Sequence, residues 1–418
     1  LSSGVFPDEM KVARVIPLFK GGDSQLINNY RPVSVLSIFS KIYERIIYNR
    51  ILKFINNNDL LYKYQFGFRA NYSTSMALIT LTDKIITAID KNDMTLGTFL
   101  DFSKAFDTID HTILLRKLYE YGVRGVANDL VKSYLEKRKQ YVFFDKLSSE
   151  SMPINCGVPQ GSILGPLLSI LYVNDIYLVS NSFMPILFAD DSSVFVQGKN
   201  INSMTTNLNN SLELIYQWTI ANRLSLNIDK TYCMLFKNKN KNPPGELRVK
   251  IANKIINVVD SCKFLGVYID ALNWEKHLNY ISKKIAKGIG IIVKARKYLK
   301  SSSLLTLYYS FVFPYVNYGI EVWGSVPSTK LTPVLKLQKR VLRVISSSHP
   351  RTCFLTIKCL MCIKYMFIKL LYLCSNFTKE AVLYFFSHFF SLINLFMIIS
   401  QDNIRDSIYH YLELIIII

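Results

Sequence analysis

The chain has 418 residues, 50% hydrophobic and 13% aromatic, so intrinsic disorder is excluded and two or three domains or subdomains are expected. Its 50 Lys and Arg against 30 Asp and Glu give a formal net charge of +20, which favours a polyanionic partner, nucleic acid before membrane. The seven cysteines are sparse and odd in number, a pattern typical of free thiols in a reducing compartment rather than of a disulfide framework.

The N-terminal part begins with a short strand and a turn. Residues 12–20 predict the strand, and a glycine-rich turn follows at 21–23. Lys20 and Arg31 flank this turn and could together grip a triphosphate, although basic side chains at such places are more often simply solvated.

Two helices are expected next. Residues 37–55 predict a helix because four apolar residues fall on roughly one face: Ile38, Ile42, Ile46 and Leu52. The asparagines at 56–58 end it. After the irregular, aromatic run 65–69, a second helix is capped by Ser73 or Thr74 and extends to about Ile89.

A carboxylate marks the end of the next strand. Residues 97–101 predict an apolar strand that ends in Asp101, a position where catalytic groups commonly lie. A turn over 102–107 leads to the helix 111–121, which Asp110 caps and Gly122 stops. We expect His111, in the first turn of this helix, to be structural.

A glycine- and proline-containing loop over 156–162 precedes an apolar helix expected at 163–179. Such a loop lets backbone approach a ligand closely. It is not a P-loop, because no Gly-Lys-Ser/Thr follows, and by itself it is a weak signal.

The run 184–196 predicts a β-hairpin with Asp190 and Asp191 at its turn. Adjacent carboxylates repel each other unless a cation lies between them, and a solvated hairpin tip is the plainer interpretation of the four turn residues alone. The third carboxylate, Asp101, at the end of another strand, favours a site instead. Three oxygen ligands from two strands suit Mg²⁺.

Further short elements follow the hairpin. Residues 211–222 predict a helix around Trp218, and 224–231 a turn and strand that includes Lys230. Residues 263–269 predict a strand pair with a bend at Gly266.

Two basic helical stripes lie toward the C-terminus. The segment 276–300 contains eight Lys or Arg and no acid. One face of it carries Lys276, Lys283, Lys287 and Lys294. A second stripe consists of Lys336, Lys339, Arg340 and Arg343. A charged stripe is usually only a solvated face, but two stripes of one sign favour contact with a phosphate backbone.

The composition changes after about Ser346. Residues 381–399 lack Asp, Glu, Lys and Arg and by length could span a bilayer, which needs about 20 residues. A buried helix and a decayed end of the chain are the alternatives, and we consider them at least as good. Cys359 and Cys362 form one CxxC with no second pair nearby, so no zinc site is expected.

Five motifs in this order resemble the reverse transcriptase domain of non-LTR (LINE-type, jockey-like) retrotransposons, over about residues 5 to 345. They are NYRPVS at 29–34, QFGFR at 65–69, LDFSKAFD at 100–107, GVPQGS at 157–162 and FADD at 188–191. Because the chain starts with Leu1, we also expect it to be a fragment of a longer protein, without the endonuclease domain of this family.

The resemblance implies an α+β right-hand polymerase fold with fingers, an antiparallel-sheet palm and a helical thumb. Fingers would span 1–96, the palm 97–272 and the basic thumb 273–345, and 346–418 would be a degenerate or accessory apolar tail. Asp101 and Asp190 would lie on neighbouring strands.

The same resemblance implies RNA-directed DNA polymerase activity by two-metal nucleotidyl transfer. Asp101 and Asp190 would ligate two Mg²⁺ ions, with Mn²⁺ as an alternative, and Asp191 would complete the cluster. The nucleotide would also be bound by Lys20, Arg31, Gln160, Gly161 and Lys230, the last of which would protonate pyrophosphate. Phe106 resembles the steric gate that excludes a ribose 2′-hydroxyl, although an aromatic at that place can also be simple core.

The implied partners are an RNA template, a DNA primer, dNTPs and the element RNA in a nuclear or cytoplasmic ribonucleoprotein. Arg69 and the basic residues of the two stripes would contact nucleic acid. Three alternatives remain open: an intron-type maturase, against which the apolar tail argues; a catalytically dead nucleic-acid-binding remnant; and a membrane-anchored protein, which rests on 381–399 alone.

Overall fold

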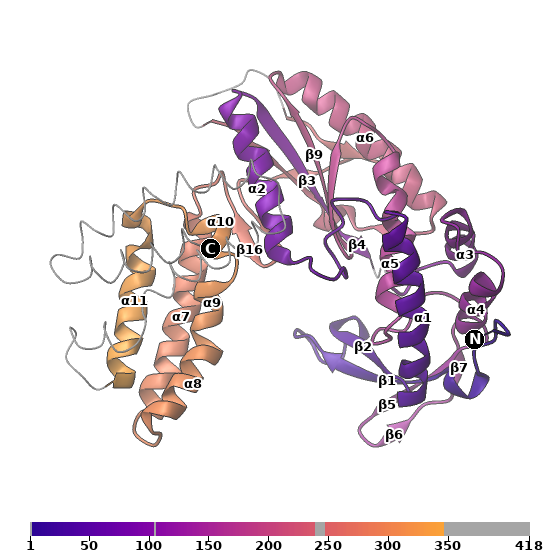
Figure 1. Cartoon of the computed structure of the whole chain (residues 1–418). Helices are drawn as coiled ribbons and strands as arrows, with labels where there is room; N and C mark the ends of the chain where they lie inside the picture. The colour runs from indigo at the N-terminus through magenta and orange to yellow at the C-terminus, as the bar shows by residue number, and fades with distance from the viewer. Residues whose placement is uncertain (1, 104–105, 239–246, 347–418) are drawn as a thin grey trace, which may run out of the picture. The chain divides into compact units, whose positions relative to one another are not determined.

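The computed structural model describes residues 2–103, 106–238 and 247–346. The chain divides into two compact units, residues 1–272 and 273–418, and each is described here by itself (Figure 1). The first contains sheets and helices, and the described part of the second is helical. The predicted α+β class is confirmed.

The central sheet of the first unit carries the acidic residues at one end. In spatial order its strands are β14 (Asn257–Val258), β11 (Tyr232–Phe236), β3 (Met94–Leu100), β9 (Asp191–Gly198) and β8 (Met184–Phe188). Its pairings are antiparallel except that of β11 with β14. Every residue of β3 is buried, which requires cover on both faces of the sheet. Helix α2 (Thr74–Asp90) packs on β3 and β8, and helix α6 (Ile201–Ala221) on β3 and β9.

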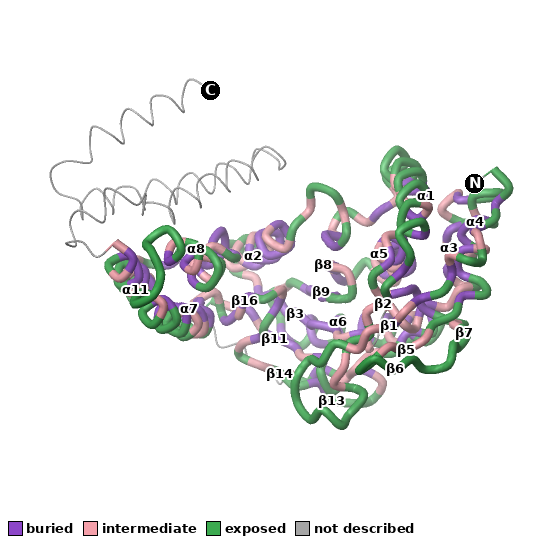
Figure 2. The backbone as a smooth tube through the Cα atoms, turned by 90° about the horizontal axis from the view of Figure 1, so that it is seen from below, coloured by how far each residue is buried: buried purple, intermediate pink, exposed green. Residues whose placement is uncertain are grey.

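A second sheet is built near the N-terminus. It pairs β2 (Tyr30–Val35), β1 (Val12–Phe19), β5 (Lys139–Phe144), β6 (Leu147–Ser148) and β7 (Met152–Pro153). Strands β1 and β2 are antiparallel with Leu18 opposite Arg31, whereas β1 and β5 run parallel. This sheet is much more exposed than the central one (Figure 2).

Four further helices lie in the described part of this unit, and α3 packs on α4 and α5. They are α1 (Ile38–Asn57), α3 (His111–Glu120), α4 (Val126–Leu135) and α5 (Gly165–Val173), with 3-10 turns at Asp8–Met10, Ile27–Asn29, Asn174–Leu178 and Ile228–Lys230. Three predicted helix starts are confirmed by side-chain caps, since Ser37, Ser73 and Asp110 accept bonds from Ser40, Met76 and Ile113 amides.

Two predicted helix boundaries were wrong. The helix expected at 163–179 is α5 followed by a 3-10 turn, and the one expected at 211–222 begins ten residues earlier, as α6 (211 − 201). Asn200 caps α6 by accepting from the amides of Asn202 and Ser203, a local signal that outweighs the polar residues in its first turns.

The expected apolar face of α1 does not face the core. Ile38, Ile42 and Ile46 are exposed, and the buried side instead contains Glu44 and Ile47, together with Ser40, Ile51 and Ile55. The Glu44 carboxylate accepts bonds from the amides of Ile163 and Leu164 at the start of α5 (2.7 and 3.1 Å). A helix N-terminus stabilises a carboxylate, so a polar contact determines which side of α1 is buried.

Three short antiparallel strand pairs complete the described part of the first unit. Strand β4 (Phe102–Ser103) pairs with β10 (Ser225–Leu226), and β12 (Lys250–Ile251) with β13 (Lys254–Ile255). The hairpin of β15 (Cys262–Phe264) and β16 (Val267–Ile269) turns through Leu265 and Gly266, both with positive φ, which fits a type I′ turn and confirms the predicted bend.

The second unit is helical over its described residues. It contains α7 (Glu275–Ala295), α8 (Ser301–Phe311), α9 (Phe313–Asn317), α10 (Ile320–Trp323) and α11 (Ser328–Ser346). Helix α7 packs on α8 and α11, and a Cβ at Gly288 would lie only 2.7 Å from the Phe311 carbonyl oxygen, so glycine permits the close approach.

The predictions for the apolar tail, including 381–399, fall outside the described residues. Within the described part of the chain, no helix combines the length and the hydropathy needed to cross a bilayer.

Candidate active site

The predicted carboxylate hairpin is present. Strands β8 and β9 end in the pair Phe188–Asp191, so Ala189 and Asp190 form a two-residue loop. Ala189 has φ 58°, and positive φ at the first loop position fits a type II′ turn. An alanine there costs about 1–2 kcal/mol relative to the right-handed region, so surrounding contacts must hold the loop. Asp190 and Asp191 are both exposed.

Asp101 lies at the same end of the sheet. It directly follows β3, in which Leu100 pairs with Ser192 of β9, so the register brings Asp101 beside Asp191. The turn before β11 holds its backbone: the Asp101 carbonyl accepts from the Asn227 amide (2.8 Å), and its amide donates to Thr231 Oγ1 (3.5 Å).

A pocket of about 460 Å³ opens at this point. Asp101, Asp191 and Lys230 line it together. Desolvation of the Asp191 carboxyl, then the negative charges of Asp190 and Asp101, raise its pKa to about 6, although the residue as a whole is exposed. Two carboxylates and one ammonium group, from three separate segments of the chain, therefore line one pocket.

The same pocket has walls that sequence analysis missed. Tyr232 of β11 and the β15–β16 hairpin, through Lys263, Phe264 and Leu265, complete it. The Tyr232 hydroxyl donates to the Lys263 carbonyl (3.1 Å) and so ties the hairpin to β11. The bend at Gly266 was visible in the sequence, but no local signal placed that hairpin beside Asp101.

Asp190 lies apart from this pocket. It lines a second, narrow pocket with Phe106, Ala189 and Tyr172. Among the residues that the structure describes, no three His, Cys, Asp or Glu side chains converge closely enough to hold a metal ion as they stand. The donor chemistry nevertheless fits Mg²⁺, because Mg²⁺ prefers hard carboxylate oxygens as ligands. A divalent cation bound between these carboxylates would also offset their mutual repulsion.

The side chain and backbone of Phe106 are fixed by two neighbours. Its ring is half-buried and meets the Phe68 ring edge to face, with centroids 5.9 Å apart and planes at 81°. Its carbonyl accepts from the Val158 amide (2.9 Å). Phe106 therefore lies between the run 65–69 and the glycine loop, next to Asp190.

The glycine loop 157–161 joins this region to β2. Gln160 Nε2 donates to Asp107 Oδ1 (2.9 Å), and the Gln160 carbonyl accepts from the Ser34 amide (2.7 Å). Gly161 has φ 118°, and a Cβ there would lie 2.6 Å from the Ser34 carbonyl oxygen, so only glycine fits. His111 Nε2 donates to the Gly157 carbonyl (2.8 Å), which supports its expected structural role.

Comparison with known proteins identifies the family. Residues 20–269 match the family model described as reverse transcriptase (RNA-dependent DNA polymerase). The chain belongs to this reverse transcriptase family. That membership confirms the resemblance and, with the mixed sheets and helices, the expected polymerase fold class.

Two insect relatives show the relationship in detail. The chain is 30% identical over 361 residues to the "RNA-directed DNA polymerase from mobile element jockey" of Drosophila melanogaster, covering 83% of this chain and 39% of that protein. It is also 30% identical over 352 residues to the "Probable RNA-directed DNA polymerase from transposon X-element" of the same species, covering 82% of this chain and 38% of that protein. The chain thus spans well under half the length of these relatives.

A solved structure is similar at lower identity. The apo telomerase from Candida tropicalis, truncated from its C-terminal domain, matches with a TM-score of 0.44 and 12% identity, covering 64% of this chain and 55% of that chain.

Of the two residues expected to bind triphosphate, Arg31 lies in β2 of the second sheet and Lys20 directly follows β1. Arg31 is opposite Leu18 in β2, and Lys20 is two residues beyond Leu18, so the register places Lys20 and Arg31 on the same face. Both are exposed, and neither is in an ion pair within residues 2–103, 106–238 and 247–346.

The residues expected to bind nucleic acid differ in their surroundings. Arg69 already donates to the carbonyls of Tyr62 and Gln65 (both 3.2 Å) and stacks on Tyr72 at 4.0 Å, so its guanidinium holds its own loop. The eight basic residues of the two predicted stripes, on α7 and α11, are exposed: Lys276, Lys283, Lys287, Lys294, Lys336, Lys339, Arg340 and Arg343.

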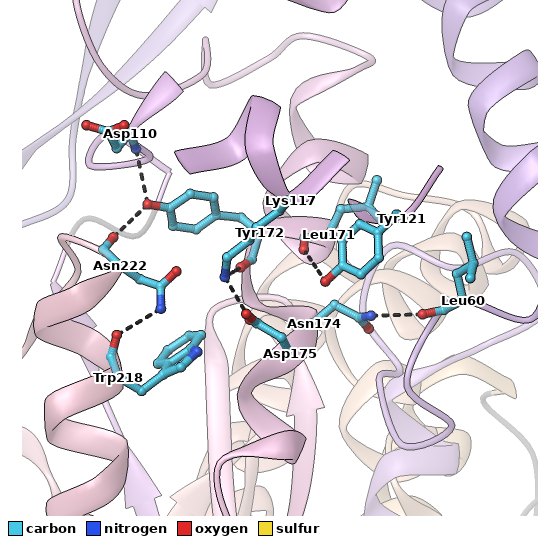
Figure 3. Close-up of polar contacts among 10 residues, drawn as sticks. All are labelled: Leu60, Asp110, Lys117, Tyr121, Leu171, Tyr172, Asn174, Asp175, Trp218 and Asn222. Atoms are coloured by element: carbon cyan, nitrogen blue, oxygen red, sulfur yellow. Dashed lines mark hydrogen bonds and ion pairs between the residues drawn. The ribbon is translucent and has the colours of Figure 1, made fainter. Parts of the chain in front are cut away.

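A partly buried polar network connects helices of the first unit through Tyr172 and Lys117 (Figure 3). The Tyr172 hydroxyl donates to the Asn222 carbonyl (2.6 Å) and accepts from the Asp110 amide (3.4 Å). Lys117 Nζ donates to the Tyr172 carbonyl (2.6 Å) and to Asp175 Oδ1 (2.7 Å). These bonds join α3, α5 and the end of α6, and Tyr172 also lines the pocket that contains Phe106 and Asp190.

Proposed function

We propose that the chain is an RNA-directed DNA polymerase that transfers a nucleotide from a dNTP to a primer 3′-hydroxyl. The observation that carries this proposal is the meeting of Asp101, Asp191 and Lys230 in one pocket at the end of the central strands. Family membership supports the same reaction.

Asp101, Asp190 and Asp191 would hold the divalent metal, two Mg²⁺ ions or alternatively Mn²⁺. When bound, the metal activates the attacking hydroxyl and neutralises charge on the triphosphate. The chain itself supplies Lys230, whose ammonium group can hydrogen-bond the leaving pyrophosphate and give it a proton. Loss of one such electrostatic group commonly costs about 10²–10³ in rate.

The other proposed contacts orient the nucleotide. Lys20 and Arg31 would bind the triphosphate, and Gln160 with Gly161 would contact the incoming nucleotide and template. The Phe106 ring would exclude a ribose 2′-hydroxyl and so select dNTPs. This role agrees with its place between Asp190 and the Phe68 ring.

We further propose that residues 1–96 form the fingers, 97–272 the palm and 273–345 the thumb. The RNA template and DNA primer would be bound through backbone phosphates by the exposed basic residues of α7 and α11, and the element RNA would be a partner in a ribonucleoprotein.

The test is extension of a DNA primer on an RNA template with dNTPs and Mg²⁺. Asp101→Asn and Asp190→Ala should each abolish extension, whereas Asp145→Ala, at an exposed turn between β5 and β6, should leave it unchanged. Absence of extension in the unmodified chain, with template binding retained, would instead favour a catalytically dead nucleic-acid-binding remnant.

A further inference from the structure

The run Tyr64–Arg69 lies along the outer edge of the carboxylate hairpin. Gln65 forms a parallel bridge with Leu187 of β8. The Leu187 amide donates to the Tyr64 carbonyl (3.0 Å), and the Phe66 amide donates to the Leu187 carbonyl (2.8 Å). The run therefore extends the sheet at β8, immediately before the Ala189–Asp190 loop.

The Gln65 side chain reaches that loop from inside the protein. Gln65 is fully buried, and its Oε1 accepts from the Gly67 amide (2.8 Å) and from the Ala189 amide (3.4 Å). Its Nε2 is buried and has no hydrogen-bond partner among the described residues. A buried amide donor without a partner costs free energy, so this donor does not favour the observed position. The bonds accepted by Oε1 are the side-chain hydrogen bonds that hold Gln65 in place.

Gly67 leaves no room between the run and the loop. A Cβ at Gly67 would overlap the backbone nitrogen of Ala189 and would lie 2.9 Å from the Phe188 carbonyl carbon. Since these are backbone atoms, no side-chain rotation could relieve the clash, and any larger residue must push the loop away.

The run itself is anchored independently of the Gln65 side chain. Arg69 bonds the carbonyls of Tyr62 and Gln65 and stacks on Tyr72, and the Phe68 ring lies against Phe106. The run is therefore a fixed support, and Ala189 has a positive φ that neighbouring contacts must hold. For this reason the Gln65–Ala189 hydrogen bond can determine the position of Asp190.

We propose that Gln65 and Gly67 are positioning residues that hold the Ala189–Asp190 loop and thereby set the place of the Asp190 carboxylate in the metal site. This inference rests on the proposed polymerase function. A displacement of about 1 Å at a reacting centre can cost about 10²-fold in rate, so a loose loop should lower turnover without weakening nucleic-acid binding.

The test compares Gln65→Met, which keeps length and loses the acceptor, with Gln65→Glu, which keeps an acceptor oxygen. Gln197→Leu is the control, because this glutamine of β9 bonds the Lys84 carbonyl and Thr95 away from the loop. Measured quantities are kcat, KM for dNTP, the Mg²⁺ concentration at half-maximal rate and the Kd for primer–template.

We expect Gln65→Met to lower kcat by about 10²-fold and to raise the half-maximal Mg²⁺ concentration, with an unchanged Kd for primer–template. Gln65→Glu should fall between Gln65→Met and the unmodified chain. Equal kinetics for the Met and Glu variants, or an Mg²⁺ requirement that neither changes, would overturn the proposal.

Two further measurements keep the test decisive. Gly67→Ala, which acts through the steric contact alone, should raise the Mg²⁺ requirement in the same direction, and it replaces Gln65→Met if circular dichroism shows that variant unfolded. Mn²⁺ binding, followed by electron paramagnetic resonance, can be measured without turnover. If the unmodified chain is inactive, the polymerase function is refuted, but Mn²⁺ affinity still tests whether Gln65 and Gly67 position the loop. Unchanged Mn²⁺ affinity in a folded Gln65→Met or Gly67→Ala variant would refute the positioning role.

Discussion

Asp101 and Asp191 line one pocket from neighbouring antiparallel strands, although they are 90 positions apart in the chain (191 − 101). The register of β3 with β9 brings them together, since Leu100 pairs with Ser192. Their mutual repulsion, with that of Asp190, contributes to the raised pKa of Asp191. The site therefore carries an electrostatic cost without a cation, and that cost predicts a dependence on pH.

The first prediction concerns stability without metal. Because burial and nearby charge raise the pKa of Asp191 from 3.8 to about 6, ionising it costs the folded state more than the unfolded chain. This contribution should therefore lower stability as pH rises from about 4 through about 6, and Asp191→Asn should remove it. Melting temperatures measured at about pH 5 and about pH 7.5 in chelator would show this, with Asp145→Asn as the control.

The same titration predicts the opposite trend for metal binding. Mg²⁺ binds the ionised carboxylate, so the concentration needed for half-maximal rate should fall as pH rises through about 6. A melting temperature of Asp191→Asn that follows pH as the unmodified chain does would contradict the assignment of this titration to Asp191.

Helix α1 shows that the local pattern of apolar residues can predict where a helix lies without predicting which of its faces is buried. The pattern of apolar residues found the helix to within two residues at either end, but Ile38, Ile42 and Ile46 are exposed. The buried side follows Glu44, whose partners are backbone amides of Ile163 and Leu164. Those partners are 119 and 120 positions away, where no periodicity within the helix can indicate them.

The candidate site likewise contains residues that the sequence indicated and residues that it did not. Asp101, Asp190 and Asp191 were recognisable because each has a local context, a strand end or a tight hairpin. The bond of Gln65 to Ala189 and the place of the Lys263 hairpin in the Asp101 pocket depend on which strand edges meet, so both form only after folding.

The second prediction concerns sugar selectivity. Phe106→Val should lower the preference for dNTP over NTP by about 10- to 200-fold, the range for small steric differences in a binding pocket. Phe68→Ala should act in the same direction but less, since the edge-to-face contact contributes about 0.5–1.5 kcal/mol to fixing the ring. Single-nucleotide kcat/KM values for dNTP and NTP measure the ratio. An unchanged ratio in Phe106→Val would show that the ring is only core.

The third prediction concerns the network beneath the site. Lys117 has a 13% exposed side chain, and its ammonium group lies near the Tyr172 and Trp218 rings. Burial lowers the pKa of Lys117, and Asp175 opposes that shift. Asp175→Asn should therefore destabilise the fold by about 2–3 kcal/mol, less than the ~3–5 kcal/mol for a fully buried pair because Asp175 keeps some solvent contact.

The comparison uses an ion pair of similar length whose basic partner is exposed. Arg223 lies 2.6 Å from Asp110 but is 73% exposed, so Arg223→Gln should cost about 0.2–1 kcal/mol. Urea unfolding of both variants gives the comparison. Equal losses would mean that burial of Lys117 contributes nothing beyond an ordinary surface pair.

The fourth prediction concerns the basic face of α7. Lys283, Lys287 and Lys294 are exposed at helical spacing, while Ile281 and Ile285 of the same helix are buried. If each lysine neutralises one phosphate, the triple Gln variant should bind primer–template more weakly and with a shallower salt dependence, by about 0.7–0.9 in log–log slope per lost contact. Fluorescence anisotropy over a salt series measures both quantities.

The control for this face is a double variant elsewhere. Lys250 and Lys254, on the β12–β13 hairpin, are also exposed, and their replacement by Gln removes surface charge without touching α7. A general loss of net charge would weaken binding in both variants roughly in proportion to the charge removed. A change of slope confined to the α7 variant would instead show that its lysines contact phosphates, whereas equal slopes in the α7 variant and the unmodified chain would remove this helix from the nucleic-acid interface.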